Sequence, residues 1–579
     1  MIKSLINKYQ TFIKYIISAG ISYAIDLFAF TIFCFVFKTQ EAYILIATIL
    51  ARVISSFINF LINKNKVFSS ENKKKSDINV LLSYYFLVVI QMLNSGITVA
   101  IIYKLLGNNL TIIKFLVDVV ILGMNYFIQK RYIFNNRHIE FTKILLNIRD
   151  FLKNNKGICV IMLISLVLHI IVLADLGIMY NLESDDLSYI ESGIYFKNNL
   201  ELIMHGVKSA QIMPGMTYFI ALVSYGFGEG KALFVVLKIV WMILGIASIL
   251  GVYKITRLYS NKVFSCIAAA FLLSIDFIWM DNTILTETPF MFGFIYLIYS
   301  SLQLARTKEN KYFYQIIIFY MICILLKANI APYPLFLIIY LIIKKYDLNK
   351  LLKQMLIAAG VLLVFFIPWT VRNYIAFDKF IPLTYGTGNP LLLGTYQGSG
   401  YPEDNQEEYD KYVEENASDE MKKYISGEET SKPYKQRYYL LEKDGLIAKY
   451  RMKKWWDTDK ASMLKSYLIF KPLGLIYNTF YWKGLFNITI GMILKLRMID
   501  IVLTIVCGVV LLFNKKTFFE CLFLAFNYIF QILVYSYTFS FSRYGQTLIF
   551  IRFIIIGMGL QVIYEKIKDK RRKRLNVNT

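Results

Sequence analysis

The chain has 579 residues, of which 57% are hydrophobic and 16% are aromatic, whereas a soluble globular domain carries roughly 45–50% apolar residues. The excess lies in apolar runs of about 18–25 residues separated by short basic clusters, the pattern of transmembrane helices. The net charge of +25 does not indicate a nucleic-acid partner, because Lys and Arg lie between the apolar runs and so mark the cytoplasmic face. We therefore expect an all-α polytopic membrane protein that binds no nucleic acid.

Four apolar runs lie near the N-terminus, at 15–37, 42–62, 80–106 and 111–129. Lysines precede the first run, and the loops NKNKVFSSENKKKSD and QKRYIFNNRH, after the second and fourth runs, are strongly basic. Because basic loops stay in the cytoplasm, the N-terminus is expected there too. We predict a first membrane domain at 1–140 and a charged cytoplasmic linker at 141–156.

The rest of the chain, 157–579, is predicted to form a second membrane domain. Its apolar runs lie at 157–178, 232–253, 264–280, 288–304, 313–328, 331–343, 353–370, 499–513, 517–536 and 546–565. A long polar region, 371–485, interrupts them and is expected outside the cell, on the same face as the acidic pair Asp185 and Asp186. The total is about fourteen spans of a bacterial cytoplasmic membrane, with both termini in the cytoplasm.

The first domain contains an internal repeat, in which ARVISSFINFLINKNKVF (51–68) aligns with VDVVILGMNYFIQKRYIF (117–134). The alignment pairs polar residues: Asn59 with Asn125, Asn63 with Gln129, Lys64 with Lys130, and Arg52 with Asp118. An intramembrane charge is costly and usually pairs or faces a polar cavity. The last pair can therefore be a structural ion pair or part of a site for an anionic headgroup. The two lysines fit phosphate attraction or the ordinary basic bias of cytoplasmic loops.

The repeated NF/NY…(N/Q)K…F pattern resembles the GtrA family of four-helix membrane proteins, over residues 10–135. That family is associated with polyprenyl-phosphate-linked sugars and is proposed to flip them across the membrane. The resemblance implies a four-helix GtrA-like bundle whose partner is a lipid-linked sugar. Its candidate lipid-phosphate contacts are Arg52, Asn59, Lys64, Asp118, Asn125 and Lys130.

Polar clusters from distant parts of the second domain are all expected on the outer face. They are Asp185 and Asp186, MPGMTYF at 213–219, DNTILTETPF at 281–290, PWTVRNYIAFDKFIPLTYGTGNPLLLG at 368–394 and FSRYGQ at 541–546. Such clustering predicts a site at the boundary between membrane and water. There a carboxylate can take the proton of an acceptor hydroxyl, and Arg or Lys can stabilise charge on a departing phosphate.

The order of these pieces resembles the GT-C glycosyltransferases, in particular protein O-mannosyltransferases and lipid A aminoarabinose transferases, over about 157–565. The resemblance implies that Asp185 or Asp186 acts as the base and that Glu287 holds the sugar or a metal ion. It also implies inversion at the anomeric carbon. The other candidate substrate contacts are Arg372, Asn373, Arg543, Tyr544 and Lys327.

The sequence departs from the family pattern at Asp378, where Gly is usual, at RYGQ, which lacks a proline after RY, and in 395–480, which resembles no known segment. The candidates also have structural alternatives. The acidic pair can cap the helix that LSYIESG begins, Glu287 can cap its own helix, and Lys327 can snorkel to the surface. For a cofactor, a divalent metal ion at Glu287 or His205 stays an open alternative.

The two resemblances predict a fusion of a GtrA-like module with a membrane glycosyltransferase. The enzyme would transfer a sugar from a polyprenyl-phosphate donor to a cell-surface glycan, lipid or protein on the outer face, among membrane lipids. Two rival functions are a lipid-linked sugar flippase with a non-catalytic GT-C scaffold, and a polymer ligase that uses a preassembled lipid-linked glycan. The acidic pair favours the enzyme, because a flippase has no use for a base at the outer surface.

Overall fold

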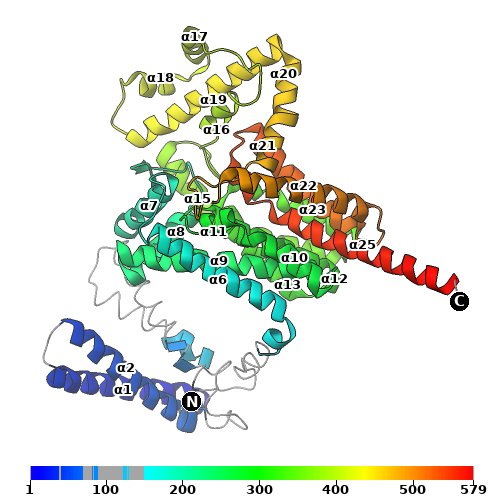
Figure 1. Cartoon of the computed structure of the whole chain (residues 1–579). Helices are drawn as coiled ribbons and strands as arrows, with labels where there is room; N and C mark the ends of the chain where they lie inside the picture. The colour runs from blue at the N-terminus through cyan, green and yellow to red at the C-terminus, as the bar shows by residue number, and fades with distance from the viewer. Residues whose placement is uncertain are drawn as a thin grey trace. The chain divides into compact units, whose positions relative to one another are not determined.

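The computed structural model describes residues 2–37, 41–68, 81, 84–85, 87–88, 122–126, 128–129 and 149–577. The chain divides into two compact units, Met1–Asn154 and Asn155–Thr579, and each is considered by itself. The described residues are almost entirely helical, with one two-stranded hairpin (Figure 1). The predicted class, an all-α polytopic membrane protein, is confirmed.

The first unit contains two long helices among its described residues, α1 (Ile2–Phe37) and α2 (Glu41–Ile62), and α2 continues into a π-helical turn, η1 (Asn63–Val67). Between the two helices, Ser55 Oγ donates to Asp26 Oδ1 at 2.7 Å. Their buried core consists of Tyr15, Phe60, Val67 and Phe68, together with Tyr84, Leu87 and Tyr126 from later in the unit. The predicted spans 80–106 and 111–129 lie largely outside the described residues and stay predictions.

Seven helices of the described part of the chain are long and apolar enough to cross a membrane, which takes about 20 residues. They are Gln10–Phe33, Lys156–Leu176, Lys231–Arg257, Glu287–Thr307, Leu348–Phe377, Phe518–Tyr537 and Ser542–Lys570. Shorter apolar helices are Gly215–Phe227, Lys262–Leu273, Asn310–Leu326 and Ala328–Ile343. The chain is therefore a multi-pass membrane protein, as predicted.

The apolar part of the second unit consists of α6 (Lys156–Leu176), α8 (Gly215–Phe227), α9 (Lys231–Arg257), α10 (Lys262–Ala270), η3 (Phe271–Leu273), α11 (Ile275–Met280), α12 (Glu287–Thr307), α13 (Asn310–Leu326), η4 (Ala328–Ile330), α14 (Tyr333–Ile343), α15 (Leu348–Phe377), α22 (Ile490–Leu512), α23 (Phe518–Tyr537), α24 (Ser542–Gln546) and α25 (Phe550–Val577). The spans that contain α12 and α25 are mostly buried, whereas α6 and α15 expose most of their side chains. Because an exposed apolar side chain on a spanning helix faces lipid, α12 and α25 form the centre of the unit and α6 and α15 its edge.

The region predicted as polar, 371–485, is mostly helical. It consists of the end of α15, α16 (Gly388–Gly394), α17 (Gln406–Asn416), α18 (Asp419–Ser426), α19 (Pro433–Thr458), α20 (Lys460–Lys465), the π-helical η5 (Ser466–Phe470) and α21 (Lys471–Tyr477). Side-chain caps begin three of these helices, since Asn405 accepts from the Glu408 N–H, Ser418 from the Met421 N–H and Asp459 from the Ser462 N–H. In Figure 1, α16 to α20 gather at one end of the second unit.

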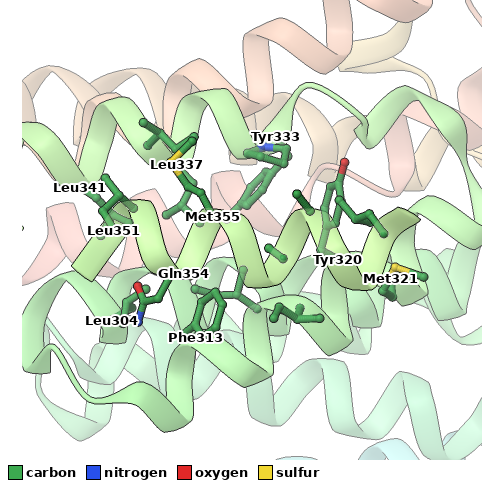
Figure 2. Close-up of a pocket in the computed structure, with 17 residues that line it drawn as sticks. Leu304, Phe313, Tyr320, Met321, Tyr333, Leu337, Leu341, Leu351, Gln354 and Met355 are labelled. Carbon is green, nitrogen blue, oxygen red and sulfur yellow. The ribbon is translucent and has the colours of Figure 1, made fainter. Parts of the chain in front are cut away.

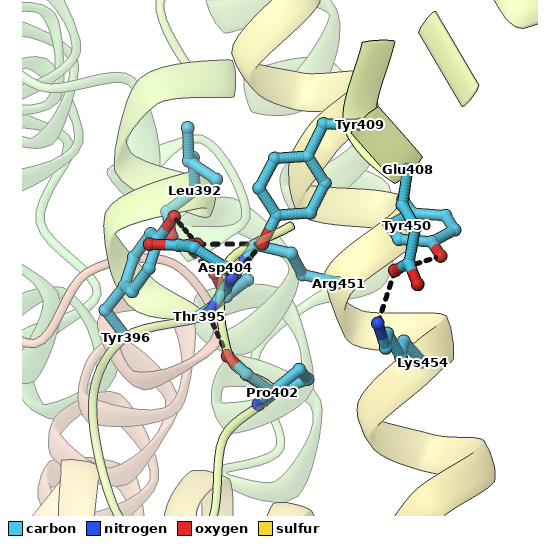
Figure 3. Close-up of polar contacts among 10 residues, drawn as sticks. All are labelled: Leu392, Thr395, Tyr396, Pro402, Asp404, Glu408, Tyr409, Tyr450, Arg451 and Lys454. Atoms are coloured by element: carbon cyan, nitrogen blue, oxygen red, sulfur yellow. Dashed lines mark hydrogen bonds and ion pairs between the residues drawn. The ribbon is translucent and has the colours of Figure 1, made fainter. Parts of the chain in front are cut away.

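The guanidinium of Arg451, on α19, holds this polar region together (Figure 3). It is fully buried and donates to Thr395 Oγ1 at 2.8 Å, to Asp404 Oδ1 at 2.5 Å and to the Pro402 carbonyl at 2.8 Å. It also lies 3.8 Å from the centre of the Tyr396 ring. Because the rigid fork of an arginine can satisfy several partners at once, this one side chain ties the segment after α16 to α19.

A buried set of four charges joins α11, α22 and α25. Arg497 forms an ion pair with Asp276 and lies 3.4 Å from Asp500, and Arg552 lies 2.6 Å from Asp500. None of the four residues is more than 3% exposed. Two cations and two carboxylates cancel in charge, which offsets the cost of keeping each of them away from water.

Candidate active site

Asp185 and Asp186 are the first two residues of α7 (Asp185–Asn199), and Asp186 stabilises the start of this helix. The Asp186 side chain is completely buried. Its carboxylate accepts hydrogen bonds from the backbone N–H groups of Leu182 at 2.7 Å, Ser184 at 3.3 Å and Leu187 at 3.0 Å. A carboxylate that satisfies orphan N–H groups at a helix start stabilises the turn before the helix. Asp186 therefore caps the start of α7, the structural alternative that the sequence left open for either acid.

The first member of the pair, Asp185, faces a cation. Its Oδ2 lies 2.5 Å from Arg543 Nη2, and its side chain stays 28% exposed. Asp185 thus has a polar environment with solvent access, unlike its buried neighbour. A carboxylate with that access can exchange a proton, which is what a general base requires.

Arg543 is the centre of an ion cluster. Its Nε lies 3.6 Å from Glu287 Oε1, and the same oxygen lies 2.7 Å from Lys327 Nζ. Lys327 also lies 4.7 Å from the centre of the Tyr544 ring. Glu287 is only 1% exposed, and a buried carboxylate is tolerable when cations are this close. With Asp185, the cluster contains two cations and two carboxylates, so its formal charge is zero.

Breaks in the helices bring these side chains together. Glu287 is the first residue of α12, Lys327 has an extended backbone between α13 and η4, and Arg543 lies on the short helix α24. A side chain at Gly545 would overlap the Leu475 carbonyl oxygen. That close approach requires glycine and accounts for RYGQ, where the family pattern has a proline.

The two cations of the cluster, Lys327 and Arg543, line a cavity of about 450 Å³. Their carboxylate partners, Asp185 and Glu287, lie beside the lining residues and are not among them. The cavity is bounded by Tyr189, Gln211, Thr286, Leu326, Lys327, Ala328, Asn329, Leu383, Thr384, Gly386, Thr387, Pro390, Val534, Tyr535, Thr538, Arg543 and Tyr544. Neutral amides and hydroxyls therefore share its wall with two cations, and Asn329 Nδ2 donates to Tyr535 OH at 2.8 Å. Such a wall can hold a phosphate beside a polyol. Sequence reasoning missed Tyr189, Gln211 and Asn329, which carry no motif.

Arg372 and Asn373 depart from the predicted convergence, because they do not line this cavity. Arg372 Nη1 donates to the Ser209 carbonyl at 2.7 Å, and Asn373 Nδ2 donates to the Ile381 carbonyl at 2.9 Å. Ser209 Oγ in turn accepts from the Gln211 N–H at 2.9 Å. Both candidates therefore bind backbone carbonyls, and Arg372 braces the segment that leads to a lining residue instead of facing the cavity.

Asp378, where the family pattern has glycine, lies just after α15 with a φ of 55°. This left-handed conformation at a helix C-terminus favours glycine, and aspartate is among the few other residues that tolerate it. The carboxylate lies 2.6 Å from Lys435 Nζ, and the hydrogen bond from this ammonium lowers the pKa of Asp378. The departure is thus compensated by an ion pair with α19.

The described residues give the open metal alternative no ligand set. They contain no group of three or more His, Cys, Asp or Glu side chains that could hold a metal ion. His205 has Ser188 as its side-chain neighbour, at 3.4 Å between Nδ1 and Oγ. Glu287 already contacts two cations, which would repel a third.

A buried histidine, His169 on α6, contacts Asp281 in the segment that precedes α12. Its Nδ1 lies 2.7 Å from the Ser165 carbonyl, and its Nε2 lies 3.1 Å from Asp281 Oδ2. Asp281 Oδ1 accepts from Thr288 Oγ1 at 2.7 Å. Ser165, His169, Asp281 and Thr288 thus form one buried chain of polar contacts. These polar contacts fix the side chain of Thr288, the residue next to Glu287. The sequence signal that could have identified His169 is an ionisable residue within an apolar run.

In the first unit, part of the candidate set lies in the described residues. Asn59 Oδ1 accepts from Asn63 Nδ2 at 2.5 Å, and Asn125 is 7% exposed. Lys64 is half-buried on η1. Three candidates lie outside the described residues: Asp118, Lys130 and the side chain of Arg52.

A second cavity, of about 240 Å³, lies between α12, α13, α14 and α15 (Figure 2). Its lining is almost wholly apolar and includes Phe313, Leu337 and Met355. Helix α13 contributes to both cavities, because its last residue, Leu326, lines the polar one together with the following residues 327–329. The apolar and the polar cavity therefore share one helix.

Two family models match the chain. Residues 8–134 match the model described as GtrA/DPMS, transmembrane domain, and residues 211–371 match the model described as dolichyl-phosphate-mannose-protein mannosyltransferase. The chain thus combines a GtrA-like membrane domain with a GT-C glycosyltransferase-like domain, as the sequence predicted. No curated protein matches it.

Solved structures give a distant likeness. ArnT from Cupriavidus metallidurans in the apo state is 12% identical, over 71% of this chain and 78% of ArnT, with a TM-score of 0.33. The same protein bound to undecaprenyl phosphate is 11% identical over the same shares, with a TM-score of 0.32. The oligosaccharyltransferase of Archaeoglobus fulgidus is 14% identical, over 72% of this chain and 52% of that protein, with a TM-score of 0.35.

Proposed function

We propose that the second unit transfers a sugar from a polyprenyl-phosphate donor to a hydroxyl group of a cell-surface glycan, lipid or protein, on the outer face of the membrane. The observation that carries this proposal is the ion cluster of Asp185, Arg543, Glu287 and Lys327 beside the polar cavity of about 450 Å³. It supplies a partly exposed carboxylate, Asp185, next to Arg543, and a second cation, Lys327, on the cavity wall. Those are the groups that a direct displacement at a sugar phosphate needs.

The chemistry divides between these residues. Arg543 and Lys327 bind the donor phosphate and stabilise the charge that grows on it as the bond from the anomeric carbon to the phosphate oxygen breaks. Asp185 accepts the proton of the acceptor hydroxyl while the new glycosidic bond forms, and the phosphate leaves with the bonding electrons. Glu287 holds the two cations in place. When the phosphate takes over the contacts of Arg543, Asp185 is released to act as the base.

The two cavities fit the two ends of such a donor. The apolar cavity between α12 and α15 suits part of an isoprenoid chain, and the cationic cavity suits the phosphate and its sugar. A volume of about 450 Å³ is near the lower end for small-ligand sites, which favours a single sugar over a preassembled glycan. ArnT, one of the distant structural neighbours, has been solved with undecaprenyl phosphate. The first unit would bind the lipid-linked sugar as a GtrA-like module.

The test compares two adjacent acids in sugar-transfer assays with the purified chain. Lipid-linked sugars that accumulate in cells lacking the protein identify the donor to be used. We expect Asp185→Asn to lower kcat by about 10²- to 10⁴-fold, the usual contribution of a general base, with a smaller loss of melting temperature than Asp186→Asn, because Asp185 is partly exposed. Asp186→Asn is the matched control, and it should lower the melting temperature while most of kcat remains. Full transfer by the Asp185→Asn variant would refute Asp185 as the base, and a lack of transfer by the unmodified chain would favour the flippase.

A further inference from the structure

The internal repeat of the first unit brings two amide side chains together inside an apolar bundle. Asn63 Nδ2 donates to Gln129 Oε1 at 3.1 Å, and the repeat alignment pairs these same two positions. Asn63 is completely buried and Gln129 is 4% exposed. The two copies of the repeat therefore meet each other through equivalent polar residues.

The backbone is unusual at both positions. Asn63 begins the π-helical turn η1, and Gln129 is π-helical as well. A π turn inserts an extra residue into an α-helix and occurs often at functional sites, because it re-aims side chains at a cost in helix stability. π-Helical backbone at the same position of both copies indicates that the repeat unit itself sets the orientation of these two amide side chains.

The amide pair retains unused hydrogen-bonding capacity. Asn63 uses its Nδ2 group on Asn59 and Gln129, but its Oδ1 atom is buried and has no hydrogen-bond partner among the residues that the structure describes. Within the same described residues, Gln129 Nε2 makes a long contact, 3.4 Å, with Tyr15 OH. A buried acceptor without a partner costs about 1–3 kcal/mol. A position that served packing alone would avoid that cost with an apolar side chain of similar volume.

An aromatic group adjoins these amides through Tyr15, whose hydroxyl contacts Gln129 Nε2. Tyr15, Phe68 and Tyr126 form a mutual contact group, with ring centres 5.4–6.3 Å apart, and all three side chains are buried. Small-molecule sites typically combine apolar and aromatic walls with a few placed polar groups. The amides are neutral and both donate and accept, as sugar hydroxyl groups do, whereas an anion alone would be better served by cations.

We propose that Asn63 and Gln129 form a second sugar-binding site of the chain, at the centre of the repeat, which binds the hydroxyl groups of a lipid-linked sugar. This inference rests on the proposed function for its ligand class, a sugar on a polyprenyl phosphate. The amide pair binds the sugar, and Lys64, the next residue of η1, is placed in the chain to meet the phosphate.

The test uses the full chain with Arg543→Gln, which silences phosphate binding in the second unit. The probes are citronellyl phosphate and the citronellyl-phosphoryl derivatives of glucose, galactose and mannose, and binding is measured by titration calorimetry. We expect Asn63→Ala to weaken the binding of at least one sugar-bearing probe by about threefold to tenfold, as the loss of one hydrogen bond predicts. Binding of citronellyl phosphate should not change.

Asn65→Ala is the matched control, because Asn65 is exposed on the same π-helical turn, and it should alter neither class of probe. Gln129→Met keeps the volume of the side chain and adds no buried charge, so it preserves the packing if Asn63→Ala does not fold; it should weaken sugar-bearing probes by a similar factor. Equal binding by the Asn63, Asn65 and Gln129 variants would overturn the proposal, and so would a lack of sugar-probe binding by the parent. The transferase proposal is decided separately, by transfer in the Asp185→Asn variant.

Discussion

Glu287→Gln tests whether the ion cluster is built to receive an anion. The carboxylate oxygen lies 2.7 Å from Lys327 Nζ and 3.6 Å from Arg543 Nε, which corresponds to gross attractions of about 6 and about 5 kcal/mol at an effective dielectric constant of about 20. Desolvation cancels much of this, and the loss of one partner from a buried pair costs about 3–5 kcal/mol. The substitution leaves the cluster with a formal charge of +1, so we expect a lower apparent melting temperature.

An added phosphate should reverse this effect. Polyprenyl phosphate supplies negative charge where Glu287 has lost it, so we expect it to raise the melting temperature of Glu287→Gln more than that of the unmodified chain. The assay is thermal unfolding in detergent with and without polyprenyl phosphate. Glu520→Gln is the matched control, because Glu520 is 4% exposed, lies 2.6 Å from Lys344 and is not among the residues that line the polar cavity. This control should lose stability without rescue, and equal rescue of the two variants would refute the reasoning.

Three further predictions concern stability. Lys471 is buried, its ammonium donates to the Gly394 and Thr538 carbonyls, and burial lowers its pKa from 10.5 to about 7. Between these two pH values the unfolded chain binds a proton that the folded chain has released. The free energy of unfolding should therefore rise with pH, by up to about 1.4 kcal/mol per pH unit. Lys471→Met should flatten that rise in thermal unfolding from pH 7 to 9, and an unchanged slope would contradict the assignment. Thr288→Val should lower the melting temperature by leaving an Asp281 oxygen unpaired, at about 1–3 kcal/mol, whereas Thr288→Ser should not; equal melting of the two would show that the hydroxyl is unimportant. Arg451→Lys should lower the free energy of unfolding by about 2 kcal/mol or more, because an ammonium cannot reproduce the planar set of guanidinium donors. Limited proteolysis should then cut the segment after α16 faster. Unchanged cleavage would show that Arg451 does not tie this segment to α19.

The apolar runs predicted most of the spanning helices because length and hydropathy alone decide whether a segment crosses a bilayer. The run at 232–253 corresponds to α9 and the run at 353–370 to α15. The run at 264–280 differs, since it divides into α10, η3 and α11. The run at 499–513 began too late, because α22 starts at Ile490.

That late start has a physical cause. The segment LKLRMID at 494–500 contains three charged residues, and the predicted run, 499–513, leaves most of it outside the helix. In the structure its Arg497 and Asp500 pair with charges from other helices, so the helix continues through them. Partners distant in sequence cannot be recognised from one helix alone.

The candidate site was predictable in its parts but not in its contacts. The order of the motifs was enough to select Glu287, Lys327 and Arg543, which the structure brings into one cluster. The choice between the two adjacent acids was not predictable, because it depends on which carboxylate faces the backbone N–H groups of its own turn. Arg372 illustrates the same limit, since its carbonyl partners come from the segment after α7.

The four-charge set of α11, α22 and α25 also constrains how the chain is made. A lone Arg or Asp at the middle of a helix opposes insertion by roughly 2.5–3.5 kcal/mol, and α22 contains one of each. Arg497 can find Asp276 in a helix that the ribosome has already released, but Asp500 must wait for Arg552. Helix α25 therefore completes the neutralisation of α22. A nascent chain whose synthesis stops before α25 keeps an unmatched negative charge at Asp500, which is a feature that membrane quality control can recognise.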